Sequence, residues 1–189
     1  FRDNTPMQFA GGAKARKFVD ELNLDKAFAG ERNIRMPDQE FFTGPVRLPP
    51  LHDYQLDVSS KIIEMLSQAT PQKGFISLPT GSGKTRVATE SIVRFCEVSD
   101  KPHLIVWIAG SNELCEQAVQ SWQTVWQCFG KTNGQLAISR LWDSRRPVEA
   151  KDADLQVVVA TFQTLSRLVE EEIYEWLFDA QVLVVDEAH

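Results

Sequence analysis

A glycine-rich turn between two apolar segments constrains this chain more than any other feature. Residues 78–86 have the sequence L-P-T-G-S-G-K-T-R, follow a short apolar run over 74–78, and open an amphipathic segment. This order predicts a strand, a turn and a helix. Gly81 and Gly83 lack a Cβ atom, so the backbone can wind tightly and bring successive N–H groups together at a helix N-terminus. The stretch therefore predicts a loop that binds phosphate groups.

Two side chains at the end of this loop suit that chemistry. Lys84 would place its ammonium group against the outer phosphates, and Thr85 would give its hydroxyl to Mg²⁺. The strict pattern has a glycine five positions before the second loop glycine, where this chain has Leu78. A surface turn before a helix is therefore an alternative interpretation of the loop when it is taken by itself.

The composition is that of an ordinary globular protein, with 43% hydrophobic and 24% charged residues in 189. A net charge of −6 argues against a uniformly basic nucleic-acid binder, although it leaves room for a local basic groove. Cys96, Cys115 and Cys128 form no C-x-x-C pair, which excludes a disulfide framework and a zinc knuckle. The longest apolar run, 104–109, is too short to span a bilayer. We expect a reducing, cytoplasmic setting and no membrane partner.

The first fifty residues carry no recognisable chemistry. An amphipathic helix is expected over 13–28, with Phe18, Val19 and Leu22 on one face. Prolines and glycines are dense over 29–50, which predicts an extended connector with room for one short strand. We therefore expect residues 1–50 to form an appendage and linker, and residues 51–189 to form the main domain. The chain begins at Phe1 and stops directly after D-E-A-H, so both ends are expected to be cut ends.

Patterns typical of buried strands alternate with amphipathic helices from Leu51 onward. Strands are expected over 104–108, 134–142, 155–161 and 181–185, and helices from Asp53, after the loop, over 115–129 and over 162–177. The last helix is expected to bury Leu165, Leu168, Val169, Ile173 and Trp176. Trp122 and Trp126 lie on the apolar stripe of the helix over 115–129, which favours core packing over base stacking. The alternation predicts an α/β fold whose parallel sheet is covered by helices on both faces.

A pair of carboxylates follows the last expected strand. In parallel α/β sheets, ligands gather beyond the carboxyl ends of the strands, and both the glycine loop and Asp186-Glu187 follow such ends. Asp186 would hold Mg²⁺ through a water molecule, while Glu187 would orient and deprotonate the water that attacks the γ-phosphate. Together with the loop, this pair predicts a site that hydrolyses a nucleoside triphosphate.

These motifs, taken in order over 51–189, resemble those of superfamily-two helicases and translocases, whose motor lobe is a RecA-like P-loop NTPase fold. L-P-T-G-S-G-K-T resembles motif I, in which the first glycine is often absent, and V-V-D-E-A-H resembles motif II of the DEAH type. L-H-D-Y-Q, at 51–55, resembles the adenine-reading Q motif, with His52 where the family usually has arginine. The resemblance implies ATP and Mg²⁺ as ligands. It implies ATP contacts from Tyr54, Gln55, Thr80, Gly81, Ser82, Gly83, Lys84, Thr85 and Arg86, metal binding by Thr85 and Asp186, catalysis by Lys84, Asp186 and Glu187, and coupling to nucleic acid by His189.

Two looser motifs concern nucleic acid. A-G-S-N-E-L-C-E-Q, at 109–117, is similar to motif Ia, and A-T-F-Q-T-L, at 160–165, is similar to the segment around motif Ib. The resemblance implies phosphate-backbone contacts from Ser111, Asn112, Thr161 and Gln163. Asn112 and Thr161 also lie where a helix N-cap belongs, so capping remains an equal alternative for these two side chains.

The resemblance implies the first RecA-like lobe of an ATP-dependent helicase or translocase, acting on DNA or RNA, with DNA favoured. The motif set is most similar to that of motor subunits of bacterial restriction and phage-defence systems, and this similarity implies partner subunits in a larger complex. A second lobe, missing here, would supply arginines to the ATP site, so the intact protein is expected to hydrolyse ATP and these 189 residues alone to be inactive. One alternative is a P-loop ATPase of another class, not acting on nucleic acid, although no L-S-G-G-Q-like signature is present. Another is a scaffold with a decayed site, against which the retained Lys84, Thr85, Asp186 and Glu187 argue.

Overall fold

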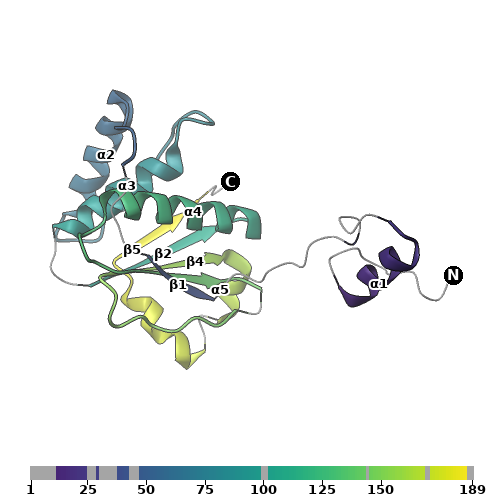
Figure 1. Cartoon of the computed structure of the whole chain (residues 1–189). Helices are drawn as coiled ribbons and strands as arrows, with labels where there is room; N and C mark the ends of the chain where they lie inside the picture. Colours follow the sequence, from purple (N-terminus) through teal and green to yellow (C-terminus); the bar gives the residue numbers. More distant parts are fainter. Residues whose placement is uncertain are drawn as a thin grey trace. The chain divides into compact units, whose positions relative to one another are not determined.

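The computed structural model describes residues 12–24, 29, 38–42, 47–98, 102–143, 145–168 and 171–186. Its elements are, in chain order, α1 (Ala13–Glu21), β1 (Gln39–Phe42), α2 (Asp53–Leu66), α3 (Lys84–Glu97), β2 (His103–Ala109), α4 (Asn112–Phe129), β3 (Leu136–Leu141), β4 (Leu155–Thr161), α5 (Phe162–Leu168), the 3-10 helix η3 (Glu172–Asp179) and β5 (Val182–Val185). Contacts divide the chain into two compact units, Phe1–Pro37 and Asp38–His189. Figure 1 shows these elements coloured along the sequence. None of the described helices is both long and apolar enough to cross a membrane.

The described residues of the first unit include the short helix α1. α1 ends at Glu21, whereas the sequence pattern predicted a helix continuing to Phe28. Asn23 has a φ of 50°, and the N–H groups of Asn23 and Leu24 donate to the carbonyls of Asp20 and Val19. Such a left-handed C-terminal cap satisfies the last carbonyl groups and ends the helix. Residues 25–28, the end of the predicted helix, lie outside the described residues.

The second unit is built on a five-stranded sheet in the order β1-β3-β4-β2-β5, as far as the described residues show. β3, β4, β2 and β5 run parallel to one another, and β1 is antiparallel to β3. All residues of β3 and β4 are buried, and burial was predicted for β4 from its apolar run. The predicted parallel α/β fold is confirmed, with one antiparallel strand added at an edge.

Helices cover both faces of the sheet. α3 and α4 pack on one face through the larger apolar cluster, which includes Ile92, Trp122 and Ile105. α5 and η3 pack on the other face, where Leu168 and Tyr174 join a second cluster with strand residues of β2 and β4. Because β3, β4, β2 and β5 are parallel, their carboxyl ends lie at one edge of the sheet, where ligands gather in open α/β folds.

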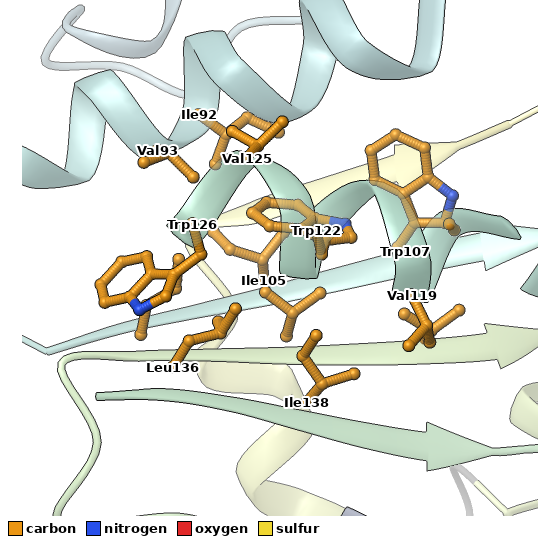
Figure 2. Close-up of a cluster of buried hydrophobic side chains, with 14 of the residues drawn as sticks. Ile92, Val93, Ile105, Trp107, Val119, Trp122, Val125, Trp126, Leu136 and Ile138 are labelled. Atoms are coloured by element: carbon orange, nitrogen blue, oxygen red, sulfur yellow. The ribbon is translucent and has the colours of Figure 1, made fainter. Parts of the chain in front are cut away.

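The two tryptophans of α4 lie in the core. Trp122 and Trp126 are 0% and 2% exposed, so the prediction that they pack in the interior is confirmed. Figure 2 shows Trp122 between α3, represented by Ile92 and Val93, and the strand residues Ile105 and Leu136. The rings of Trp107 and Trp122 meet edge to face, with centroids 6.0 Å apart.

Replacing Trp122 with alanine is expected to lower the free energy of unfolding by about 3–5 kcal/mol, because the change leaves a large cavity between α3 and the sheet. Phe178 in η3 is 70% exposed and provides the matched control. Phe178→Ala should change the unfolding free energy by less than about 1 kcal/mol. Chemical denaturation of both variants measures the difference, and equal effects would contradict the assignment of Trp122 to the core.

The expected connector over 29–50 contributes a strand to the sheet. β1 pairs with β3 from Gln39↔Ser139 to Phe42↔Leu136, so the sheet-containing unit begins at Asp38 rather than near Leu51. Arg140 on β3 is 0% exposed and forms ion pairs of 3.1 Å with Glu40 on β1 and with Glu116 on α4. A buried guanidinium needs such partners because losing water is costly for a charge. Arg140 therefore ties β1 to the sheet and to α4.

Residues 74–78 do not form the strand that their apolar run predicted. They pair with none of the described strands, and Phe75 is 86% exposed, while Ile76 packs against the cluster of Leu51, Ile62 and Val87. A strand requires hydrogen bonds to a neighbouring strand, so an apolar run that lacks one stays extended and unpaired. β5 lies at the edge of the sheet, with Leu183 62% exposed.

The prediction of a single helix over 162–177 is also wrong. The chain forms α5 up to Leu168 and then η3 from Glu172. A 3-10 helix has three residues per turn, so Tyr174 and Leu177 share its buried face. Ile173 is consequently 68% exposed rather than internal. Leu165 and Trp176 pack partly buried on the second cluster, and Val169 lies outside the described residues.

Candidate functional site

The glycine loop winds as its sequence predicted. Gly81 and Gly83 have φ angles of 76° and 80°, in the left-handed region that favours glycine, and Gly83 is the N-cap of α3. Ser82 closes the turn, since its N–H and its hydroxyl both donate to the carbonyl of Pro79, at 3.2 and 2.6 Å. The loop is therefore a tight turn at a helix N-terminus, where backbone N–H groups and the helix dipole favour an anion.

Lys84 folds its side chain back over this loop. Its ammonium nitrogen donates to the carbonyl oxygens of Leu78, at 3.1 Å, and Pro79, at 3.4 Å. Two neutral carbonyls are weaker partners for an ammonium group than an anionic phosphate oxygen. The lysine is thus held at the loop by contacts that a phosphate group can replace.

Two residues of the first turn of α2 hold the loop from outside. The Gln55 side-chain amide and the Tyr54 hydroxyl donate to the carbonyl of Ser82, at 2.8 and 3.3 Å. Gln55 is 5% exposed, and its side-chain oxygen accepts the backbone N–H of His52 at 2.9 Å. A Cβ atom on Gly83 would lie 2.9 Å from the Gln55 amide nitrogen, so glycine permits this close approach. α2 begins at Asp53, as expected, and His52 is its N-cap.

The other loop residues have distinct surroundings. Thr80 is exposed, while Thr85, in the first turn of α3, is partly buried. Within the described part of the chain, the Thr85 hydroxyl makes no hydrogen bond, whereas its carbonyl accepts the hydroxyl of Thr89 at 2.7 Å. Arg86 turns away from the loop: its guanidinium donates to the carbonyl of Pro49 and lies 3.5 Å from a carboxylate oxygen of Glu90.

The carboxylate pair at the end of the chain is described only in part. Asp186 directly follows β5, and its N–H donates to the carbonyl of Ile108 at 2.8 Å, which continues the β2–β5 ladder. Asp186 therefore lies at the carboxyl edge of the sheet, as predicted. Glu187 and His189 lie outside the described residues. No group of three or more metal-ligating side chains occurs within the ranges that the structure describes.

The predicted nucleic-acid contacts meet at the same edge. Ala109 pairs with Thr161 in the last rung of the β2–β4 ladder, so the segments carrying Ser111, Asn112 and Gln163 follow neighbouring strands. The Ser111 hydroxyl accepts the N–H of Leu114 at 3.3 Å, which makes Ser111 the N-cap of α4.

Asn112 is therefore not the N-cap that its position suggested. It is the first residue of α4, and its side chain donates to Asp143, at 2.8 Å, in the loop after β3. Thr161 is 6% exposed, and its hydroxyl accepts the backbone N–H of Thr164 at 3.4 Å. In the structure its side chain therefore caps the start of α5. The Gln163 side chain is exposed.

The pKa shifts at this edge of the sheet differ from those in the protein interior. Hydrogen bonds from its own backbone and from Ser111 lower the pKa of Glu113, in the first turn of α4. Burial raises the pKa of the Cys96 and Cys115 thiols to about 12 in each case, so both are inert core groups. At the opposite edge, burial and then Lys131 lower the pKa of His103.

Two contacts of the site were not predicted. Asp143, the partner of Asn112, has a φ of 56° in a loop that carried no motif. Glu90 is 1% exposed in α3 and pairs with Arg86 and Arg94. The spacing R-x-x-x-E-x-x-x-R over 86–94 was a visible signal, because residues four apart lie on one side of a helix.

A mostly parallel sheet with a glycine loop at the start of a helix defines an α/β protein of the phosphate-binding-loop class. The family described as "Type III restriction enzyme, res subunit" matches residues 48–189. The chain belongs to this family. A comparison with curated proteins finds no significant match.

Two solved structures are similar to this chain, and the first of them shows a related fold. One is a nuclease-deletion mutant of the Type ISP restriction-modification enzyme LlaGI in complex with a DNA substrate mimic, with a TM-score of 0.57 and 16% identity over 75% of this chain. Another is the ATP-dependent Type ISP restriction-modification enzyme LlaBIII bound to DNA, with a TM-score of 0.47 and 16% identity over 72% of this chain. This chain spans only 15% and 10% of those two chains.

Proposed function

We propose that this chain is the ATP-binding, RecA-like lobe of an ATP-dependent helicase or translocase that acts on DNA. One observation carries the proposal. The Gln55 side chain donates to the Ser82 carbonyl in the glycine loop of a chain that belongs to the restriction-enzyme res subunit family, which supports one site for the base and the phosphates. The related LlaGI structure was obtained with a DNA substrate mimic, which supports DNA as the partner.

The residues present suit Mg-ATP. The left-handed Gly81 and Gly83 leave the loop open to an anion, and Lys84 can exchange its carbonyl partners for phosphate oxygens. Thr85, with its unused hydroxyl, and Asp186 would hold Mg²⁺, which neutralises phosphate charge when bound. Gln55 and Tyr54 would bind the base beside the loop.

The remaining roles follow the order of the chain. Glu187 would take the proton of the attacking water, and His189 would couple the nucleotide site to the DNA. Ser111, Asn112, Thr161 and Gln163 form the proposed DNA-backbone edge. Because Thr161 is buried, its part is to fix the backbone of this edge rather than to reach a phosphate with its hydroxyl. Arginines from a second RecA-like lobe would complete the ATP site, within a restriction or phage-defence complex.

ATP hydrolysis by the intact protein should rise at least about tenfold with DNA, whereas the 189 residues alone should bind Mg-ATP weakly and turn it over negligibly. Coupled phosphate-release assays with duplex DNA, single-stranded DNA and RNA measure this. ATP hydrolysis at a rate that does not change when nucleic acid is added would instead favour a P-loop ATPase of another class. Absence of nucleotide binding would favour a non-enzymatic scaffold.

A further inference from the structure

A buried carboxylate lies one helical turn beyond the phosphate loop. Glu90 on α3 is 1% exposed, and arginines lie one turn to either side of it. Its Oε1 accepts from Arg94 Nη2 at 2.8 Å and from Arg94 Nε at 3.1 Å, while its Oε2 lies 3.5 Å from Arg86 Nη2. A charge removed from water is costly unless it is paired, so this carboxylate depends on its arginines.

Arg86 extends this pair to another segment. Its guanidinium also donates to the carbonyl of Pro49, in the segment that leads into α2, and its side chain is only 28% exposed. The planar guanidinium presents several donors in fixed directions, so one group can serve a carboxylate and a carbonyl at once. Arg86 therefore binds α3 to the approach to α2 instead of facing the loop.

The α2 approach is attached to α3 at two points. Arg86 holds Pro49, and three residues after Pro49 the helix cap at His52 begins the turn that carries Tyr54 and Gln55. The second point is the Ser82 carbonyl, which accepts from Tyr54 and Gln55. With both points in place, the position of Gln55 relative to the phosphate loop is fixed.

The other arginine serves a different contact. Arg94 is 43% exposed, and its guanidinium lies over the ring of Phe129 on α4, 4.7 Å from the centroid. Arg94 thus connects Glu90 to α4, on the side away from α2. Arg86 contacts both Glu90 and the α2 approach, whereas Arg94 contacts Glu90 and α4. Variants of the two arginines therefore separate the effect of the Arg86–Pro49 contact from the effect of removing a partner of the buried Glu90 carboxylate.

We propose that Glu90 is a positioning residue for nucleotide recognition: it holds Arg86 against the Pro49 carbonyl and so sets Gln55 at the distance from the phosphate loop that lets base and phosphates bind together. The inference rests on the proposed function, because it requires that the loop bind a nucleotide. It assigns Arg86 to the positioning of α2 rather than to direct contact with ATP.

The test compares Mg-ATP with magnesium tripolyphosphate, a ligand that has phosphates and no base. Calorimetric titration of the intact protein should show ATP binding more tightly than tripolyphosphate. Glu90→Gln should weaken ATP binding about tenfold, because it removes the negative charge that lies 3.5 Å from Arg86 Nη2, and leave tripolyphosphate binding within about twofold. A purely structural role would weaken both ligands alike. If wild-type protein binds neither ligand, the proposed function itself fails.

Two further variants keep the test decisive. Arg86→Lys retains the charge but lacks the planar fork, so it should lower the preference for ATP over tripolyphosphate in the same direction, even if Glu90→Gln does not fold. Arg94→Gln, the matched control, should leave that preference unchanged. The proposal is overturned if Glu90→Gln and Arg86→Lys keep the wild-type preference, if Arg86→Lys weakens both ligands equally, or if Arg94→Gln lowers the preference as much as Glu90→Gln.

Discussion

Replacing Lys84 with alanine is expected to lower kcat/KM for ATP hydrolysis by the intact protein about 100- to 1,000-fold, the usual loss for one donor that stabilises developing charge. The ammonium group already lies at the loop, 3.1 Å from the carbonyl of Leu78, so a phosphate oxygen needs only to displace that carbonyl. Alanine leaves no cation there. Steady-state hydrolysis with saturating DNA measures the loss.

A matched control separates this chemistry from loss of charge or of fold. Lys61 is exposed on α2, and Lys61→Ala removes one positive charge without touching the loop. It should retain wild-type turnover. Both variants should melt within a few degrees of wild type, because among the described residues the Lys84 ammonium group donates only to loop carbonyls. Turnover by Lys84→Ala above about a tenth of the wild-type value would remove Lys84 from the proposed site.

The sequence predicted the interior of the second unit well, because local pattern and tertiary burial agree there. Strands β2 and β4 are nearly continuous apolar runs, and α4 has the strict helical spacing that places Trp122 and Trp126 inside. The two glycines of the loop were equally informative, since few other residues adopt a φ near 80°.

The differences arise where pairing across the chain decides the structure. β1 pairs with β3 about 100 residues further on and is tied there by the buried Arg140, which no local pattern reveals. The apolar run over 74–78 has strand composition but pairs with none of the strands in the described residues. Over 162–177 the pattern suited one helix, yet the chain changes to a 3-10 helix that buries Tyr174. Periodicity predicts burial for a given helix type, and it does not select the type.

In the candidate site, too, the local chemistry was predictable from the sequence, whereas the contacts that depend on packing were not. Lys84 and the glycines follow from local chemistry, and Gln55 was implied by its motif. The contact that joins them, from Gln55 to the Ser82 carbonyl, depends on how α2 packs against α3. The hydroxyls of Ser59 and Ser91 meet at 2.8 Å in the same interface, and Leu51, Ile62 and Val87 pack there. The sequence order alone does not reveal that packing.

Replacing Glu187 with glutamine is expected to lower kcat for ATP hydrolysis about 100- to 10,000-fold, the range attributed to general acid–base catalysis, while the Kd for Mg-ATP stays within about twofold. Glutamine has nearly the shape of glutamate, so binding should persist, but its amide cannot accept the proton of the attacking water. Rapid-quench hydrolysis and equilibrium nucleotide titration of the intact protein measure the two quantities.

Asp186→Asn provides the informative comparison for Glu187→Gln. Asp186 extends the β2–β5 ladder through its N–H bond to Ile108, which asparagine preserves, so the fold should be retained. Because Asp186 is proposed to hold Mg²⁺, this variant should weaken magnesium-dependent ATP binding, unlike Glu187→Gln. Near-normal turnover in Glu187→Gln would mean that another group takes the proton. Equal loss of ATP binding in both variants would mean that Glu187 holds the metal and is not the base.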